Sequence, residues 1–344
     1  MSLDERKALL LRAVVHDFIQ TAEPVGSKAL SERYTLGVSP ATIRNELAVL
    51  EAEGYLSHPH TSAGRVPTER GYRFYVDSLS GVNDLAHAQE EAVVRYLTGT
   101  AGLEEILQRT SLLLATLTRY TAMVTTPAID NARLRHVELV LLSPHVVLMV
   151  LIVDTGQVSK RIIESASEVT NEDLDELRRQ LNDKLVRERL SRAELALSGM
   201  APQVRPERRG LFAVLADAIV QLASDRSTER VWVGGQAHIA GPGVFDGLDT
   251  IRRVYEALEQ QVLLLRLLEA TMRTSDHQLS VVIGSENKVE GMEAVSLVTA
   301  TYPAGDTTGT IGVLGPTRMD YLRAMAAVQA VASYLGAVLD DVER

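Results

Sequence analysis

Apolar residues recur at helical spacing through most of the first 80 residues. Leu11 and Phe18 lie on one face of a first helix, which is expected to stop before Pro24. A second, shorter helix is predicted after Ser27, and a tight turn is predicted at 36–38. The chain is therefore expected to begin with two helices and a turn.

The third predicted helix has two different faces. Ser39 can cap its N-terminus, and Pro40 suits the first helical position. Ile43, Leu47 and Leu50 recur on one side, which is expected to face a core. The opposite side carries small and hydrogen-bonding residues, namely Ala41, Thr42, Arg44, Asn45 and Ala48. Small side chains permit close approach, and Arg and Asn can each form paired hydrogen bonds with base edges.

A hairpin is predicted directly behind this helix. It consists of a short apolar strand at 55–56, a polar tip at 58–65 and a return through Val66. A polar helix face alone is usually a solvated surface, and hairpins are common. The succession of all these elements is more specific, and it predicts a winged helix-turn-helix. The residues expected to contact DNA are Lys28, Ser39, Ala41, Thr42, Arg44, Asn45, His60, Thr61, Ser62, Gly64 and Arg65.

One more helix is predicted at 68–79, after the hairpin. Its aromatic residues Tyr72 and Tyr75 could contact DNA, but packing under the hairpin is the favoured interpretation. A linker is expected at 80–84.

The remaining chain alternates between helical and strand patterns. Strands are predicted at 133–142, 146–153, 158–163, 231–233, 279–283, 294–301 and 308–314. Helical patterns occupy much of the intervening chain and the last segment, 318–339. Because the strand-rich pattern stops near residue 165 and resumes near residue 279, we expect one α/β domain interrupted by a mainly helical insertion.

Composition narrows the possible classes of protein. Hydrophobic residues make up 46% of the chain and charged residues 23%, as in ordinary soluble proteins. The absence of cysteine excludes disulfides and thiolate metal sites. Neither a signal peptide nor an uninterrupted apolar segment of membrane-spanning length occurs. We therefore expect a cytoplasmic protein without membrane contact.

A net charge of −10 argues at first against a nucleic-acid partner. The charge is unevenly distributed, however: between residues 54 and 76, Arg65, Arg70 and Arg73 stand against Glu69 alone. The acidic excess lies further along the chain. This distribution predicts a protein that reads specific DNA sites with few phosphate contacts.

No catalytic or metal-binding pattern stands out in the sequence. The eight histidines show no metal-ligand spacing, and Gly309, Gly312 and Gly315 are not followed by the Gly-Lys-Ser/Thr of a phosphate-binding loop. We therefore expect neither an enzyme nor a cofactor.

Several uninterrupted motifs, in order along the chain, resemble one known family, the heat-inducible transcription repressor HrcA of bacteria. These motifs are PVGS at 24–27, SPATIRNE at 39–46, PHTSAGR at 59–65, GYRFYV at 71–76 and GVLGPTRM at 312–319. The resemblance extends over nearly the whole chain and is most specific at the N-terminus.

The resemblance implies an α+β multidomain protein. It implies a winged-helix DNA-binding domain at 1–79 and a GAF-like domain in two segments, 84–165 and 279–344. The interruption, 166–278, is expected to be a dimerisation domain. The implied function is negative regulation of heat-shock operons by a homodimer bound to double-stranded DNA at an inverted repeat of the CIRCE type.

The resemblance also implies a GroEL-type chaperonin as partner. The nearly uncharged stretch 137–153 offers a physical reason, because it is strongly β-prone and would aggregate if exposed. Its partner strands are expected at 279–314, which emerge much later, so pairing would be slow.

Two other functions remain open from the sequence. The GAF-like domain could sense a metabolite and so control repression, although fold alone does not identify a ligand. A scaffolding role for the winged helix is least favoured, since Arg44, Asn45 and Arg65 occupy positions predicted to be exposed.

Overall fold

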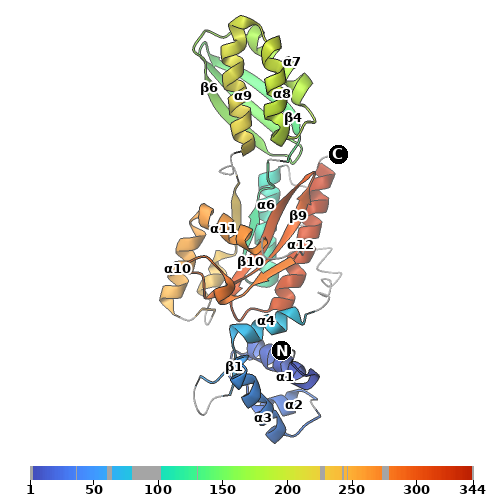
Figure 1. Ribbon diagram of the computed structural model, residues 1–344. Coiled ribbons are helices and arrows are strands. Elements are labelled where there is room, and N and C mark those ends of the chain that lie inside the picture. Colours follow the sequence, from blue (N-terminus) through green and yellow to red (C-terminus); the bar gives the residue numbers. More distant parts are fainter. Residues whose placement is uncertain are drawn as a thin grey trace.

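The computed structural model describes residues 3–35, 37–59, 64–79, 102–129, 131–224, 229–241, 244–245, 247–272 and 279–342. It shows a mixed α+β chain whose three units follow one another in a row (Figure 1). The N-terminal domain lies at one end, the central domain lies in the middle and the inserted domain lies at the other end.

The N-terminal domain contains three helices, a hairpin and a fourth helix. Its elements are α1 (Glu5–Thr21), α2 (Ser27–Arg33), α3 (Pro40–Ala52), β1 (Leu56–Ser57), β2 (Val66–Pro67) and α4 (Glu69–Asp77). Leu11, Leu30 and Ile43, one from each of the first three helices, have no exposed surface and lie in one core. The predicted order of elements is thus observed.

A five-stranded antiparallel sheet forms the centre of the central domain. Its strands are β3 (Thr121–Thr125), β7 (Val231–Gly234), β8 (Leu279–Val282), β9 (Val295–Ala304) and β10 (Thr307–Pro316), in the order β7-β3-β10-β9-β8. The helices of this domain are α6 (Leu103–Thr118), α10 (Leu248–Leu258), α11 (Gln261–Met272) and α12 (Tyr321–Val342).

These helices cover both faces of the sheet. Ala122 and Val124 of β3 pack in the same cluster as α6 and α12, whereas Met123, between them, packs in the cluster of α10 and α11. Successive side chains of a strand point to opposite faces, so a strand covered on both sides is buried throughout. All five residues of β3 are accordingly buried.

The inserted domain has its own sheet and its own core. Its elements are β4 (Leu134–Ser143), β5 (Val146–Val153), β6 (Val158–Glu164), α7 (Asn171–Leu185), α8 (Ala193–Met200) and α9 (Arg209–Ser224). The three strands form an antiparallel meander, and one of its faces packs against the helices. Thr170 opens α7 with the capping box that its spacing from Asp173 predicts.

The structure corrects the predicted limits of the insertion. The meander at 133–163 was assigned to the sheet that resumes at residue 279, but its strands pair only with one another and its core is separate. The central sheet instead takes β3 and β7, and α10 and α11, assigned to the insertion, lie on that sheet. The insertion therefore lies between β3 and β7. Strand patterning predicts that a segment is extended but does not identify its partner, so the sequence misplaced this boundary.

Helix α12 is long and apolar enough, by length and composition, to cross a membrane. Half of its 321–340 segment is buried inside the structure, where Tyr321, Val328 and Leu335 have no exposed surface. Core helices of soluble proteins pass the same test, and α12 packs on β9 as such a helix does.

Candidate nucleic-acid interface

Helix α3 presents one face to the protein and the other to the outside, as its periodicity predicts. Ile43, Leu47 and Leu50 are buried. Arg44 and Asn45 are exposed on the other side. Ala41 and Ala48 are exposed with them, which leaves a shallow outer face open to close approach.

The N-terminus of α3 is fixed by local hydrogen bonds. The backbone N–H of Thr42 donates to Oγ of Ser39 over 3.2 Å, and the two hydroxyl oxygens lie 3.0 Å apart. Pro40 occupies the first helical position. Ser39 therefore acts as a helix cap, although its exposed position still lets it meet a phosphate.

Acidic side chains around α3 are paired within the N-terminal domain. Arg6 lies 2.5 Å from Glu46, and Arg33 lies 2.6 Å from the mostly buried Asp17. The hydrogen bond and charge of Asp17 raise the pKa of Arg33. Because arginines of the same domain neutralise these carboxylates, the outer face of α3 is not dominated by negative charge.

Arg44 has no ion pair within the described part of the chain, which leaves its guanidinium available. Lys28 on α2 is similarly open: its side chain is 87% exposed and its ammonium lies 3.9 Å from Glu32, at the outer limit of an ion pair. Exposed pairs of this kind contribute little, so Lys28 can exchange Glu32 for a phosphate.

Arg65, also expected to contact DNA, forms an ion pair within the N-terminal domain. Its Nε lies 2.7 Å from Oε2 of Glu51, and its side chain is only 20% exposed. Its backbone also exchanges two hydrogen bonds with Val25, of 2.8 and 2.9 Å. Arg65 thus fastens the hairpin to α3 and to the segment before α2. A DNA contact by this side chain would require the Glu51 pair to open.

Gly64 is also explained by packing. A Cβ at this position would lie 2.4 Å from the carbonyl carbon of Val25, closer than real side chains approach. Glycine is therefore required for the hairpin to reach Val25. His60, Thr61 and Ser62, the other hairpin residues expected to contact DNA, lie outside the described residues.

Tyr72 and Tyr75 are buried, which confirms that they pack rather than contact DNA. The sequence did not reveal their partner in full: the Tyr72 ring lies 6.0 Å from that of Tyr321 in the central domain. The ion pairs of Glu46 and Glu51 were also missed, because their partners lie on other elements at separations that no periodicity predicts.

Within the described residues, no group of three His, Asp or Glu side chains is placed to hold a metal ion. The exposed features of the described N-terminal domain are thus a capped helix end, a shallow helix face and the cationic groups of Arg44 and Lys28. These are the chemical requirements for contact with a phosphate backbone and base edges.

Comparison with known proteins identifies the family. Residues 104–325 match the model of the HrcA protein C terminal domain. The chain belongs to the HrcA family. The heat-inducible transcription repressor HrcA of Streptomyces avermitilis is 43% identical over 340 residues, which cover 98% of this chain and 99% of that protein. The repressor of the same name from Acidothermus cellulolyticus is 45% identical over 341 residues, with the same coverage.

HrcA proteins are negative regulators of transcription rather than enzymes, which confirms the prediction made from the motifs. The fold is also found in a crystal structure of a hypothetical protein. That chain is 22% identical, with a TM-score of 0.65 and coverage of 99% of both chains.

Proposed function

We propose that this HrcA protein represses heat-shock operons by binding an inverted repeat of the CIRCE type in double-stranded DNA. The observation that carries the proposal is the outer face of α3, where Arg44 and Asn45 are exposed on a helix with a fixed N-terminus. In this proposal the N-terminal domain is a winged helix-turn-helix, and α3 enters the major groove.

The protein binds as a homodimer, since one such helix reads too few base pairs to specify a site. Two-fold symmetry in the protein matches the symmetry of an inverted repeat. The inserted domain supplies the contact through the open face of its sheet.

That open face is unusually apolar. On β5, both the buried and the half-buried alternating positions are apolar throughout. Val140, Leu148 and Ile162 are register partners across the three strands, and Ile162 is 64% exposed. A sheet with one solvated face normally alternates apolar and polar residues, so an apolar second face favours a partner sheet.

The central domain is GAF-like in this proposal, and it connects the DNA-binding domain to the dimerisation domain. A metabolite sensor in this domain is not favoured, because buried polar groups here satisfy one another. Ser296 Oγ lies 2.9 Å from the hydroxyl of Tyr321, and Tyr302 donates to the carbonyl oxygen of Thr125. Sites built for polar ligands normally leave such groups convergent on a cavity. A cytoplasmic location follows from the DNA partner.

The test is to recover the DNA that the purified protein selects from fragmented chromosome. We expect an inverted repeat upstream of chaperonin genes, with half-sites about 34 Å apart or a multiple of that distance. Recovery of fragments without a common repeat would refute the proposal.

A further inference from the structure

Helix α4 belongs to the N-terminal domain in sequence but is fastened to the central domain. Tyr72, Tyr75 and Val76 are buried, and one continuous core cluster includes both these residues and α12. The helix lies between the two domains in Figure 1. The orientation of α3 therefore depends on how α4 is held.

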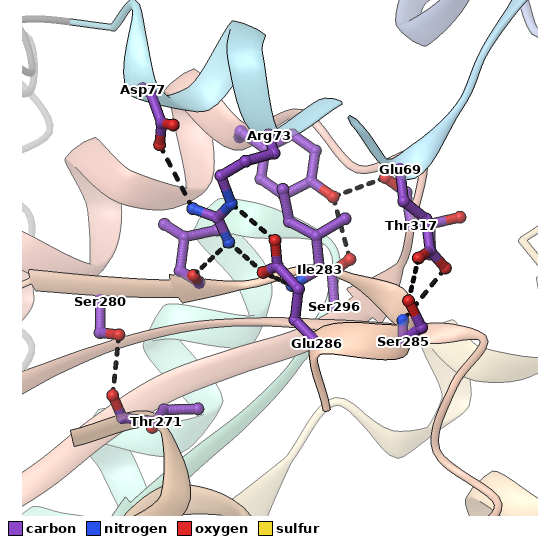
Figure 2. A network of polar contacts seen from close by, with 12 residues as sticks. Glu69, Arg73, Asp77, Thr271, Ser280, Ile283, Ser285, Glu286, Ser296 and Thr317 are labelled. Atoms are coloured by element: carbon purple, nitrogen blue, oxygen red, sulfur yellow. Dashed lines mark hydrogen bonds and ion pairs between the residues drawn. The ribbon is translucent and has the colours of Figure 1, made fainter. Parts of the chain in front are cut away.

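Arg73 forms the centre of a polar contact between the domains (Figure 2). Its Nε donates to Oε1 of Glu286 over 2.8 Å, and its Nη2 donates both to the other oxygen of Glu286 and to the carbonyl of Val281, the latter over 2.7 Å. Glu286 is itself fixed by the backbone N–H of Ile283, 2.9 Å away. A two-pronged contact between a fixed carboxylate and a guanidinium defines direction as well as distance.

Glu69 makes a second contact one helical turn earlier. Its carboxylate accepts hydrogen bonds from the backbone N–H of Ser285, over 3.0 Å, and from the Ser285 hydroxyl. Gly284 allows this approach, because a Cβ there would lie 2.1 Å from Oε1 of Glu69. Its φ of +53° is also a conformation that favours glycine.

Both acidic and basic contacts end on the same short turn, η6 (Gly284–Glu286). Glu69 and Arg73 are four residues apart on α4, so they stand on one face of the helix. With the contact between Tyr72 and Tyr321, three separated anchors hold α4. Three anchors that are not in line prevent both rotation and sliding of one body on another.

We propose that Glu69 and Arg73 are positioning residues for operator recognition: they set the direction in which each protomer presents α3. The inference rests on the proposed binding of a dimer to an inverted repeat. In a dimer, fixed presentation confines the two recognition helices to one separation and one face of the DNA. The α4–η6 contact thereby determines which half-site spacing the protein accepts.

The first test requires no DNA. The chain has no cysteine, so Glu32→Cys and Arg323→Cys place one spin label on α2 and one on α12. Distances are measured by pulsed electron resonance with labelled chain diluted in unlabelled chain. The parent should give one narrow distance, and Arg73→Ala and Gly284→Ala should each give a broader distribution. Unchanged distributions would overturn the inference whether or not the protein binds an inverted repeat.

The second test compares the DNA repeat that the protein selects with a version lengthened by about 5 base pairs, which turns one half-site to the opposite side of the duplex. The parent should prefer the selected spacing by at least roughly tenfold, and Arg73→Ala should lose most of that preference. Gly284→Ala, which changes the other domain, should have the same effect.

Arg70→Ala is the matched control, because Arg70 lies on the same helix but bonds within its own domain, to Glu53 and Tyr55. Its effect should be equal on both spacings. An equal loss in Arg73→Ala would show a merely structural role and refute the inference. Tighter binding by Arg73→Ala would also refute it, because the contact would then restrain an inactive arrangement.

Discussion

Arg44 and Asn45 differ from their neighbours on α3 in lacking a partner within the described part of the protein, whereas Glu46 and Glu51 are paired. We expect Arg44→Ala or Asn45→Ala to cost about 1–3 kcal/mol on the selected repeat and less on random DNA. Titration of both DNAs checks this difference. Arg252→Ala, an exposed arginine on α10, is the control. An equal loss on both DNAs would mean that Arg44 contacts phosphate instead of base edges.

The sequence predicts side chains whose role depends on local periodicity, and it fails where the role depends on a distant partner. The two faces of α3 follow from a 3.6-residue repeat, so Ile43 was placed inward and Arg44 outward correctly. Arg65 is predicted to be exposed in the hairpin, but its side chain is only 20% exposed. Its pairing with Glu51 depends on how the hairpin folds back against α3, which no spacing in the sequence encodes.

At the scale of elements, the sequence predicts most of the strands but neither their assembly nor β3, whose residues follow a helical pattern that is expected to continue to about residue 124. The segment 133–163 has the alternation and turns of a meander, which the structure confirms. Nothing in that alternation says whether the meander joins a later sheet or packs on following helices. The apolar residues at the half-buried positions of β5 indicate something further about assembly. An antiparallel strand that is apolar on both faces is normally covered on both faces.

The open sheet face therefore allows a prediction about assembly. Ile162→Asp should dissociate the dimer, because a two-fold interface buries the carboxylate twice. We expect a cost of at least about 3 kcal/mol in dimer stability, from the lost apolar burial alone. Because Ile162 is exposed in the protomer, the melting temperature of the monomeric variant should differ little from that of the parent monomer. Sedimentation velocity measures the dissociation.

Leu195→Asp is the matched control for Ile162→Asp. Leu195 is 79% exposed on α8, which lies on the helical side of the same domain. It should leave the dimer intact. If Leu195→Asp dissociated the dimer and Ile162→Asp did not, the helical side would be the interface.

At the scale of the whole molecule, the structure changes the physical reason for expecting that a chaperonin assists folding. The sequence predicts that the stretch 137–153 pairs with strands near residue 279, but β4 pairs with β5, and β5 pairs with β6, which follows directly in the chain. The strand whose partners are synthesised much later is β3. Its neighbours in the sheet are β7 and β10, which are synthesised only after the entire inserted domain.

Strand β3 is buried along its whole length in the native sheet, so it stays exposed and prone to aggregate until β10 emerges. Pairing across so long a segment is slow. We therefore expect GroEL-type chaperonin with ATP to raise the yield of repressor that binds its operator after dilution from denaturant. If damaged proteins occupied the chaperonin during heat stress, less active repressor would form and its target genes would be released.

The fluorescence of Trp232 can follow this step directly. It is the single tryptophan of the chain, and it lies on β7 as the register partner of Val124 on β3. The change in Trp232 emission should accelerate with chaperonin and ATP, and operator binding should recover with the same time course. Chaperonin without ATP is the control, and it should slow both the change in Trp232 emission and the recovery of operator binding. Equal recovery of operator binding with and without chaperonin would contradict the requirement, because β3 would then find its partners unaided.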